Sequence, residues 1–563
     1  MTPRSIGLGA MRLSTAPDRP SEEAALELLG AAIEAGVTLL DTAHAYGLDD
    51  GDLGANERLV GRAWREGVEI VTKVGMRRPK GRWAPDGRKK TLLAHAEASA
   101  EALGRVPDAV LLHALDPSTA LETSARALRE ILDRGLARAV GVSNVRLGEL
   151  DRLRAEAPVS IVEVAVSPFD DDAVRGGVVE RCLQDGLRVL AHSPLGGPKR
   201  APRLGRHAVL GPIATAHHAS PGTIALAWLY GIHPRLVPIP GARRLETALA
   251  AARAPRIELS HEERARLDGA FAVGRLLRVA SEDRRPEHPH AEVVLLMGIP
   301  GAGKSTAARR WVERGYERLS RDERGGTLKG LAEVLGERLR DGAERVVMDN
   351  TYATRAQRNL VIDTAWRHGA AVRCEHLDTP IAEAQINAVD RMLSRHGALL
   401  DPAGIAVANK TDPNIFPPQV QFRFRDAMEP PTEDEGFTHV ETVPFVRAAE
   451  LDHDRAGVVC DVDALDAIGA TEGPVLVLAW LPGASDADVA AARARVPEAY
   501  ALGVCVHPAG PPVCWCRRPL PGLVVEWMRR ERVDPARSRY VGASAADATL
   551  AERLGIPYTD ASR

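Results

Sequence analysis

The stretch "VTLLDTAHAYG", residues 37–47, joins an apolar run to polar side chains and indicates the fold of the first half of the chain. Its first four residues are apolar or β-branched, which is typical of a buried strand, and Asp41 and Tyr46 follow where that strand would end. The preceding stretch "EEAALELLGAAIEAG", residues 22–36, reads as a helix. A helix that leads into a short buried strand is a building unit of parallel α/β sheets.

The same unit recurs through the first 280 residues. Strand-like runs follow helical runs at "VEIVTKV", "AVLLHAL", "ARAVGVSN", "RVLAHSPLG" and "RLVPIPGA". Such repetition over about 250 residues predicts a (β/α)8 TIM barrel. The carboxyl ends of the strands form the functional face of such a barrel, so we expect Asp41, Lys73, His113, Ser143 and Asn144 to gather there.

The motifs "LDTAHAYG", "VTKVG", "LLHALD", "GVSN", "SPLG" and "IPGARR" resemble those of the aldo-keto reductase family, in family order and across the whole segment. The resemblance implies that Tyr46 donates a proton to a carbonyl oxygen and that Lys73, held by Asp41, lowers the pKa of this tyrosine. It also implies that His113 orients the carbonyl. The implied cofactor is NADP(H), and the implied substrate is a small or end-linked aldehyde or ketone.

The resemblance also assigns cofactor contacts. Ser143 and Asn144 would hold the nicotinamide carboxamide, and two arginines would meet the 2′-phosphate of NADP through charge-assisted hydrogen bonds. Glu163 stands where the family usually has Gln, and His192 stands where it usually has Tyr. These departures leave open a barrel whose cofactor site is fading, but the retained catalytic positions favour an active reductase. The expected cofactor-binding residues are Ser143, Asn144, Glu163, His192, Arg243 and Arg244.

A second motif lies in the middle of the chain, at "VVLLMGIPGAGKSTAARRW", residues 293–311. It reads as strand, loop and helix, and residues 298–305 fit the pattern G-x-x-x-x-G-K-[ST] of a phosphate-binding loop. Lys304 would reach the β- and γ-phosphates of ATP, and Ser305 would ligate Mg²⁺. The motif predicts a P-loop NTPase-type parallel sheet but not the phosphate acceptor. The expected nucleotide-binding residues are Gly298, Gly301, Gly303, Lys304, Ser305 and Thr306.

The stretches "RLSRDERGG", "RVVMDNTYATRAQR", "AEAQINAVDRMLSRHG" and "EPPTEDEGF" resemble, in order, the kinase domain of polynucleotide kinase-phosphatases. The resemblance makes Asp322 the general base for a 5′-hydroxyl, and Arg391 and Arg395 lid arginines that stabilise the transferring phosphoryl group. It also places Arg358 at the nucleotide site. Taken alone, Asp322 could instead cap a helix, and the two lid arginines could form a solvated helix face.

The last segment contains "AGVVCDVDALD", "CVHPAGPPVCWCRRPLPG" and "RSRYVGASAADATLAERLGIPY". These stretches resemble haloacid-dehalogenase-type (HAD) phosphatases, in particular a branch with a zinc loop. The resemblance makes Asp461 a nucleophile and Asp463 its acid–base partner. The usual Mg²⁺-binding Asp is replaced by Ala543, so we expect a weak or inactive phosphatase.

The loop between these two stretches supplies the pattern of a metal site. Two C-x-[CH] pairs on a proline-rich loop suit a closed tetrahedral zinc site, and the alternative is a set of buried thiols. The expected zinc ligands are Cys505, His507, Cys514 and Cys516.

Composition bounds the remaining possibilities. The 563 residues are 45% hydrophobic and 26% charged with a formal net charge of −3, which is ordinary for a soluble multidomain protein and gives no global basic field for nucleic acid. The start has no apolar signal core and no apolar run would span a bilayer, so we expect a cytoplasmic protein without a membrane partner. The predicted domains are a barrel (1–280), a linker (281–291), a kinase (292–450) and a HAD-like domain with a zinc loop (451–563).

The domain order matches that of nucleic-acid end-healing enzymes. The sequence therefore predicts an ATP-dependent polynucleotide 5′-hydroxyl kinase, acting on RNA or DNA ends in repair, fused to an NADP-dependent reductase and a degenerate phosphatase domain. The alternative is a metabolic enzyme whose reductase and kinase act on one small carbonyl or polyol metabolite. A third possibility is that the barrel and the phosphatase domain are non-catalytic scaffolds.

Overall fold

The computed structural model describes residues 5–278, 281–447 and 453–561, and the chain forms two compact units, Met1–Arg284 and Arg285–Arg563. The predicted domain boundaries at 280/281 and 450/451 involve residues outside the described ranges. The predicted linker, residues 281–291, contains a short helix, α14 (Ser281–Arg284), and strand β11 starts at its last residue. Within the described ranges, no helix has both the length and the apolar composition needed to cross a membrane.

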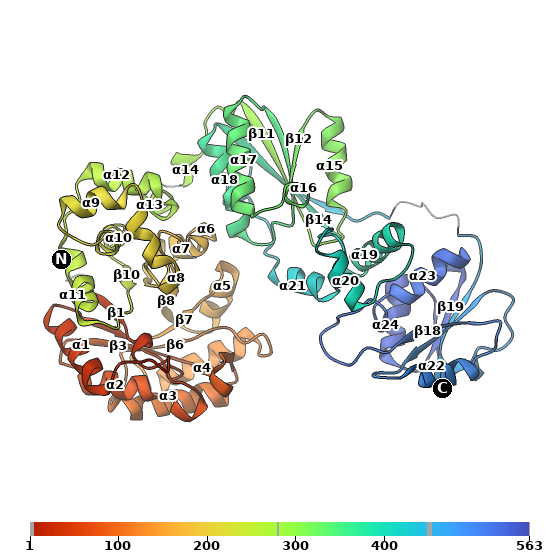
Figure 1. The fold of residues 1–563 in the computed structure, drawn as a ribbon, viewed down its shortest axis with the longest axis horizontal. Coiled ribbons are helices and arrows are strands. Elements are labelled where there is room, and N and C mark those ends of the chain that lie inside the picture. Colours follow the sequence, from red (N-terminus) through yellow and green to blue (C-terminus); the bar gives the residue numbers. More distant parts are fainter. Residues whose placement is uncertain (1–4, 279–280, 448–452, 562–563) are drawn as a thin grey trace. The chain divides into compact units, whose positions relative to one another are not determined.

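The first unit contains an eight-stranded parallel sheet that closes on itself, as the sequence predicts (Figure 1). The strand order is β1-β2-β3-β6-β7-β8-β9-β10, and the Gly9 N–H donates to Pro240 O at 3.0 Å where the two ends of the sheet meet. The strands are β1 (Gly7–Gly9), β2 (Leu39–Asp41), β3 (Glu69–Val74), β6 (Ala109–Leu112), β7 (Val140–Ser143), β8 (Val159–Ala165), β9 (Arg188–His192) and β10 (Leu236–Ile239).

Helices surround the barrel and bury their apolar faces against it. Helix α1 illustrates the local cause: Ser21 caps its first turn by accepting from the Ala24 N–H at 3.3 Å, and Leu28 and Leu29 are buried on its inner face. The main outer helices are α1 (Glu22–Glu34), α2 (Ala55–Ala63), α3 (Lys89–Leu103), α4 (Leu121–Asp133), α5 (Leu147–Glu156), α7 (Val178–Gln184), α10 (Pro221–Tyr230) and α11 (Leu245–Arg253).

Apolar side chains fill the barrel interior, as expected for a packed core rather than a pore. Leu111, Ile161 and Leu190 belong to this interior cluster. Gly141 of β7 gives them room, because a Cβ there would approach Leu111 Cδ2 to 2.2 Å and Ile161 O to 2.3 Å. The glycine of the "GVSN" motif is therefore required by packing inside the barrel.

The second unit begins with the P-loop domain, whose five-stranded parallel sheet has the order β12-β13-β11-β14-β15. Figure 1 shows α17 and α18 on one side of this sheet and α15 on the other. The strands are β11 (Ala291–Met297), β12 (Glu317–Ser320), β13 (Arg345–Asp349), β14 (Ala370–Asp378) and β15 (Val440–Pro444). The helices are α15 (Lys304–Glu313), α16 (Arg321–Arg324), α17 (Leu328–Arg340) and α18 (Arg355–Arg367).

Residues 381–427, which we call the lid segment, follow β14 and consist of α19 (Ile381–His396), α20 (Pro402–Ala408) and α21 (Gln419–Ala427).

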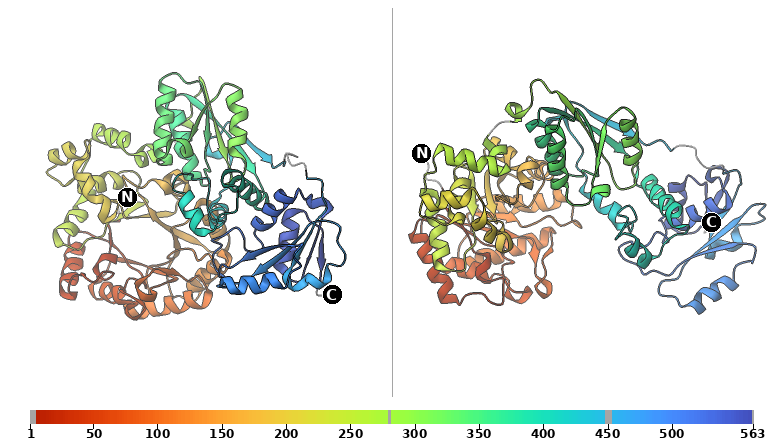
Figure 2. Two further views of the ribbon diagram at one scale, coloured as in Figure 1. Left: turned by 45° about the vertical axis from the view of Figure 1, so that its right-hand side comes forward. Right: turned by 45° about the horizontal axis from the view of Figure 1, so that its top comes forward.

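The C-terminal domain has a second five-stranded parallel sheet, of order β18-β17-β16-β19-β20. Helices α23 and α24 lie on one side of it and α22 lies on the other (Figures 1 and 2). Its elements are β16 (Val458–Asp461), β17 (Val475–Trp480), α22 (Asp486–Ala494), β18 (Ala501–Cys505), α23 (Gly522–Glu531), β19 (Arg539–Gly542), α24 (Ala545–Leu554) and β20 (Tyr558–Asp560). A parallel α/β sheet is consistent with the predicted HAD-like fold, which stays a prediction.

One hydrophobic core belongs jointly to the lid segment and the C-terminal domain. Met392 of α19 and Phe416 lie in the same buried cluster as Trp515, Val524 and Trp527 of the C-terminal domain. The P-loop sheet has its own two cores on its two faces. The lid segment is therefore packed against the following domain as well as against its own.

Candidate active sites

The predicted catalytic residues of the barrel meet at the carboxyl ends of β2 and β3. Lys73 is fully buried, and its ammonium is hydrogen-bonded to Asp41 Oδ1. The same nitrogen donates to Tyr46 Oη at 3.2 Å and to Thr42 O at 3.1 Å, and it forms an ion pair with Glu163 Oε2 at 3.2 Å. The structure thus brings one cation between two carboxyl groups and a phenol.

Burial sets the electrostatics of this cluster. Burial raises the pKa of the Asp41 carboxyl well above its usual range, Glu163 raises it further, and Lys73 opposes both. Burial also raises the pKa of Tyr46. The Lys73 ammonium lowers this pKa, as expected from the sequence, but burial outweighs it and the net pKa is raised. Burial lowers the pKa of Lys73, but Asp41 and Glu163 outweigh it and the net pKa is raised. Lys73 is therefore a permanent positive charge beside the tyrosine hydroxyl.

His113 follows β6 and its ring meets the Tyr46 ring edge-on, with centroids 5.6 Å apart. Burial and, to a smaller extent, the nearby Lys73 charge together lower its pKa to about 3, so the imidazole is neutral at physiological pH. Its Nδ1 is buried and has no hydrogen-bond partner among the described residues. A neutral imidazole beside the tyrosine hydroxyl is suited to orient a carbonyl group.

Trp83 is a residue that sequence reasoning missed. Its side chain is 46% exposed. The centroid of its ring lies 6.3 Å from that of Tyr46 and 5.8 Å from that of His113. The Arg78 guanidinium stacks over the ring at 3.8 Å. A tryptophan in the Gly- and Pro-rich stretch "KGRWAPDG" was the available signal.

The expected nicotinamide contacts lie close together at the ends of β7 and β9. Asn144 Nδ2 donates to Ser143 Oγ at 3.0 Å, and Asn144 Oδ1 lies 2.9 Å from His192 Nε2. Asn144 has a φ of 58°, a left-handed conformation that asparagine tolerates better than most residues. Its N–H donates to Glu163 O at 2.9 Å, so Glu163 connects this group to Lys73 through both backbone and side chain.

The two arginines expected at a 2′-phosphate lie next to β10, but they differ in their surroundings. Arg243 forms an ion pair with Asp18 at 2.9 Å and lowers the pKa of that carboxyl. Arg244 is exposed at the start of α11. A phosphate group at this place would compete with Asp18 for Arg243.

The phosphate-binding loop has the backbone that its glycines predict. Gly298, Gly301 and Gly303 have φ values of 154°, 90° and 91°. Lys304 Nζ donates to Gly298 O at 2.8 Å and to Ile299 O at 3.0 Å. The pKa of Lys304 is lowered to about 8, chiefly by burial and also by the Arg391 charge, while Asp349 and Asp322 oppose this shift.

Ser305 and Thr306 are exposed at the N-terminus of α15, where helix geometry favours an anion.

Two carboxylates are placed on the acceptor side of this loop. Asp322 is exposed on the short helix α16, and Asp349 is buried at the end of β13. Arg318 holds Asp349 Oδ2 through two hydrogen bonds, at 2.6 and 3.1 Å. The charges of Asp322 and Asp349 both raise the pKa values of Lys304 and Arg391. The predicted base, the lysine and the lid arginine therefore share one electrostatic environment.

The lid arginines are held by the loop between α20 and α21. Arg391 Nη1 donates to Asn414 Oδ1 at 3.1 Å, and Arg395 is hydrogen-bonded to Asp412. Asn387, one turn before Arg391, donates to Gly301 O at 2.9 Å and so connects α19 to the phosphate-binding loop. Asn414 was not predicted, because it lies outside every motif.

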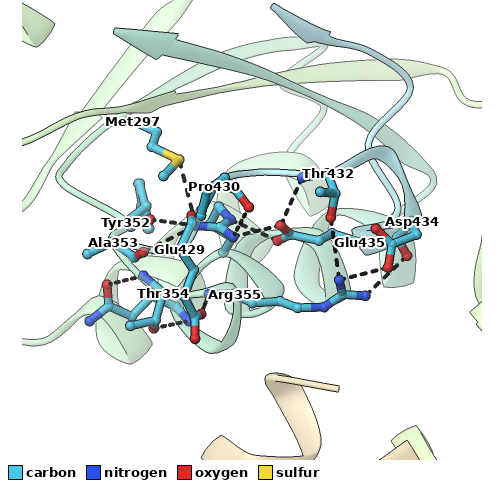
Figure 3. A network of polar contacts seen from close by, with 12 residues as sticks. Met297, Tyr352, Ala353, Thr354, Arg355, Glu429, Pro430, Thr432, Asp434 and Glu435 are labelled. Atoms are coloured by element: carbon cyan, nitrogen blue, oxygen red, sulfur yellow. Dashed lines mark hydrogen bonds and ion pairs between the residues drawn. The ribbon is translucent and has the colours of Figure 1, made fainter. Parts of the chain in front are cut away.

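Arg358 is placed differently from the sequence-based expectation. Its side chain is fully buried, and it donates to both carboxylate oxygens of Glu435 at 2.6 and 2.7 Å. It also donates to the carbonyls of Tyr352, Ala353 and Glu429. Figure 3 shows this network, in which residues 352–355 meet residues 429–435. Arg358 thus anchors the "EPPTEDEGF" segment to α18, and its Nη1 also contacts Met297 Sδ of β11 at 3.6 Å (Figure 3).

The predicted phosphatase residues do not form an open metal site. Asp461 and the buried Asp547 are both ion-paired with Nη1 of Arg518. Asp547 also accepts from Tyr540 Oη at 2.9 Å and from the Ser544 N–H at 3.1 Å. The Arg518 guanidinium therefore pairs with the two carboxylates that a divalent cation would need as ligands. These residues do not fit Mg²⁺.

The side chain of Asp463 is not part of this ion-paired group, although the N–H of this residue donates to Asp461 Oδ1 at 2.8 Å. Its side chain is 79% exposed, and its ion pair is with Arg495 at 3.8 Å. Sequence reasoning missed Arg518, although the residue stands in the quoted "CRRP" motif. Its partners lie far from it in the chain and are adjacent only in the folded domain.

The four predicted zinc ligands converge. One ligand atom from each of Cys505, His507, Cys514 and Cys516 lies within 4.8 Å of the others. Cys505 Sγ is 3.8 Å from Cys514 Sγ and 3.6 Å from His507 Nδ1. With Zn–S bonds of about 2.3 Å, two sulfurs of a tetrahedral site stand about 3.8 Å apart. Three thiols and one imidazole at this spacing fit zinc, and we call residues 505–516 the knuckle.

Comparisons with known proteins agree with the barrel. Residues 5–272 match the model of the aldo/keto reductase family, and residues 293–401 match that of an AAA domain. A Schizosaccharomyces pombe protein described as aldo-keto reductase yakc [NADP(+)] is 27% identical over 311 residues, covering 48% of this chain and 90% of the yeast protein. A Glycine max protein described as probable aldo-keto reductase 1 is 25% identical over 305 residues, covering 48% and 86%.

Among solved structures, an aldo-keto reductase from Klebsiella pneumoniae in complex with NADPH is 26% identical. It has a TM-score of 0.41, with 49% of this chain and 92% of that chain covered. The class defined by the barrel and by the arrangement of Asp41, Tyr46, Lys73 and His113 is thus that of a carbonyl reductase. The match supports an aldo-keto reductase domain in residues 5–272, and residues 293–401 match an AAA domain that follows it.

Proposed function

We propose that the barrel is an NADP(H)-dependent reductase of a small or end-linked aldehyde or ketone. The observation that carries this proposal is the buried Lys73 ammonium, hydrogen-bonded to Asp41 and 3.2 Å from Tyr46 Oη. Names of relatives support the cofactor, since the S. pombe protein is described with NADP(+) and the K. pneumoniae structure contains NADPH. When bound, the nicotinamide supplies a hydride to the carbonyl carbon.

The residues of the chain supply the proton and the orientation. The neutral His113 imidazole would hold the carbonyl oxygen next to Tyr46, whose hydroxyl donates the proton to that oxygen. Lys73 stabilises the tyrosinate that remains, because a positive charge beside the oxygen favours its ionised form. Ser143, Asn144 and His192, which are hydrogen-bonded to one another, would hold the cofactor ring.

Tyr46→Phe tests this proposal directly. We expect reduction of a model aldehyde to fall by at least about 10²-fold, because the proton donor is needed in the transition state. NADPH affinity, measured by fluorescence quenching, should stay near that of the wild type. Trp83→Phe serves as a control that alters the same face of the barrel but retains the donor. Wild-type turnover by the Tyr46→Phe protein would refute the assignment.

We propose that the second unit is an ATP-dependent kinase whose acceptor is the 5′-hydroxyl of a polynucleotide, RNA or DNA. Lys304 and Ser305 would hold the phosphates and Mg²⁺, and Asp322 would take the proton of the acceptor hydroxyl. Arg391 would stabilise the charge of the transferring phosphoryl group. Support comes from the charges of Asp349, Arg391 and Asp322, each of which acts on the pKa of the buried Lys304, and from the hydrogen bond of Asn387, one turn before Arg391, to Gly301 O of the phosphate-binding loop.

The acceptor decides between two versions of this proposal. Phosphate transfer from labelled ATP to a 5′-OH oligonucleotide would support end processing in nucleic-acid repair, in the cytoplasm and without a membrane partner. Phosphorylation of a small alcohol or polyol alone would support the metabolic alternative instead. We propose that the C-terminal domain binds zinc and is not catalytic. Its catalytic role is excluded from the proposal because Arg518 is ion-paired with both Asp461 and Asp547.

A further inference from the structure

The C-terminal domain packs against the turn of the lid helix in which Arg391 lies. Helix α19 buries Met392 and Leu393 in a core shared with Val524 and Trp527 of the C-terminal domain. Arg529 of α23 adds polar contacts, since its Nη1 donates to Asp390 O at 3.2 Å and to Ser394 Oγ at 2.9 Å. These lid residues directly flank Arg391 in the sequence, so the position of this arginine depends on the packing of α19 against the C-terminal domain.

The knuckle contributes directly to the same interface. Trp515, between the two expected ligands Cys514 and Cys516, is completely buried. Its indole N–H donates to Phe416 O at 3.0 Å, and the two rings pack with centroids 6.3 Å apart. Phe416 belongs to the lid segment, so a side chain held between two cysteines supports the loop that leads into α21.

A short chain of contacts continues from the knuckle to the phosphate-binding loop. The N–H of Gln419, the first residue of α21, donates to Pro512 O of the knuckle at 3.3 Å. Two residues later, the fully buried Gln421 donates from Nε2 to Pro300 O and to Ala384 O, both at 2.8 Å. Helix α21 therefore touches the knuckle at its start and the phosphate-binding loop within its first turn.

We propose that the C-terminal domain is a support for the kinase lid, and that metal bound at the knuckle anchors this support and thereby fixes the lid segment over the nucleotide. The proposal rests on the proposed kinase function of the P-loop domain. It gives a task to a domain whose phosphatase-like carboxylates are occupied by Arg518. A closed four-ligand site contributes folding energy to the loop that holds it, so loss of the metal should loosen Trp515 and the lid together.

The first experiment removes the metal from the full-length protein. Zinc is measured by mass spectrometry before and after treatment with a zinc-selective chelator, and Mg²⁺ is then restored. We expect amide hydrogen exchange in residues 381–427 to rise at least about tenfold and the affinity for Mg·AMP-PNP to fall by a similar factor. Binding of NADPH to the barrel should not change and serves as the internal control. An emptied knuckle with unchanged lid exchange and nucleotide affinity overturns the proposal, as does freshly purified protein without metal there.

A second experiment leaves the knuckle intact and tests the interface alone. Arg529→Ala removes the two polar contacts to α19, whereas Arg530→Ala, on the neighbouring position of the same helix, removes a hydrogen bond to Glu531 at 3.2 Å. We expect only Arg529→Ala to raise exchange in α19, by up to about tenfold, and to lower turnover with ATP. Equal behaviour of the two variants overturns the proposal.

The readouts separate this inference from the proposed acceptor. Lid exchange and Mg·AMP-PNP affinity require no acceptor. If no polynucleotide is phosphorylated but both readouts respond to chelation, the support stands and the proposed kinase substrate fails.

Discussion

Arg358→Met should locally unfold the contact between α18 and the "EPPTEDEGF" segment. Methionine keeps much of the side-chain volume but removes the charge, and the Glu435 carboxylate, 2% exposed, is left without the guanidinium that binds both of its oxygens. The carbonyls of Tyr352, Ala353 and Glu429 lose a donor in the same substitution. Breaking a buried ion pair from one side costs about 3–5 kcal/mol.

Hydrogen exchange of individual peptides is the suitable assay, because the protein has several domains and one global unfolding transition cannot be assumed. A cost of about 3–5 kcal/mol corresponds to an increase of about 10²- to 4 × 10³-fold in local opening, which peptides covering residues 352–358 and 429–437 would report. Combining Arg358→Met with Glu435→Gln should restore part of the protection, since no charge is then left buried.

Arg355→Ala is the matched control, one turn earlier on the same helix. Its ion pair with Asp434 at 2.8 Å is partly exposed, with 65% of the Asp434 side chain accessible, so the expected cost is below about 1 kcal/mol. The reasoning is refuted if Arg358→Met changes exchange no more than Arg355→Ala does. Unchanged exchange together with weakened Mg·ATP binding would show that Arg358 acts in nucleotide binding, as its motif predicts.

Three further outcomes are expected. Glu163→Gln removes a negative charge that raises the pKa values of Asp41 and Tyr46. Because each acid then ionises more easily, both limbs of the kcat–pH profile for carbonyl reduction should move to lower pH. Limbs that stay in place or move to higher pH would contradict this. Asp322→Asn should abolish labelled phosphate transfer to a 5′-OH oligonucleotide at unchanged Mg·ATP affinity, and full transfer would exclude this residue as the base. Hydrolysis of p-nitrophenyl phosphate with Mg²⁺ should be undetectable; fast turnover that Asp461→Asn removes would show an active phosphatase.

The barrel and the phosphate-binding loop could be predicted because their signals are local. Strand and helix periods repeat along the chain, and polar residues at strand ends must share one face of a closed barrel. The glycines at 298, 301 and 303 likewise specify their own backbone, which the structure reproduces. The spacing of the knuckle cysteines predicted a convergence that the structure also shows.

The roles of the arginines could not be read from the sequence. Arg358 lies in a kinase-like motif, yet its partner Glu435 is 77 residues away and the pair is buried in packing. Arg518 meets Asp461 and Asp547 only in the folded domain, because both carboxylates lie far from it in the chain. The long-range partner of a guanidinium is decided by tertiary contacts, and a single sequence carries no record of them.

The position of Arg518 has a consequence for how the C-terminal domain responds to its surroundings. A divalent ion between two carboxylates exchanges with the medium, so its occupancy follows the free metal concentration. A guanidinium is attached to the chain, so its local concentration is constant and no chelator or ionic depletion can extract it. This cluster should therefore hold its charge balance in conditions that strip the knuckle. A titration with increasingly strong chelators would then empty the knuckle, while the ion pairs of Arg518, two residues further along the chain, would lose no charge.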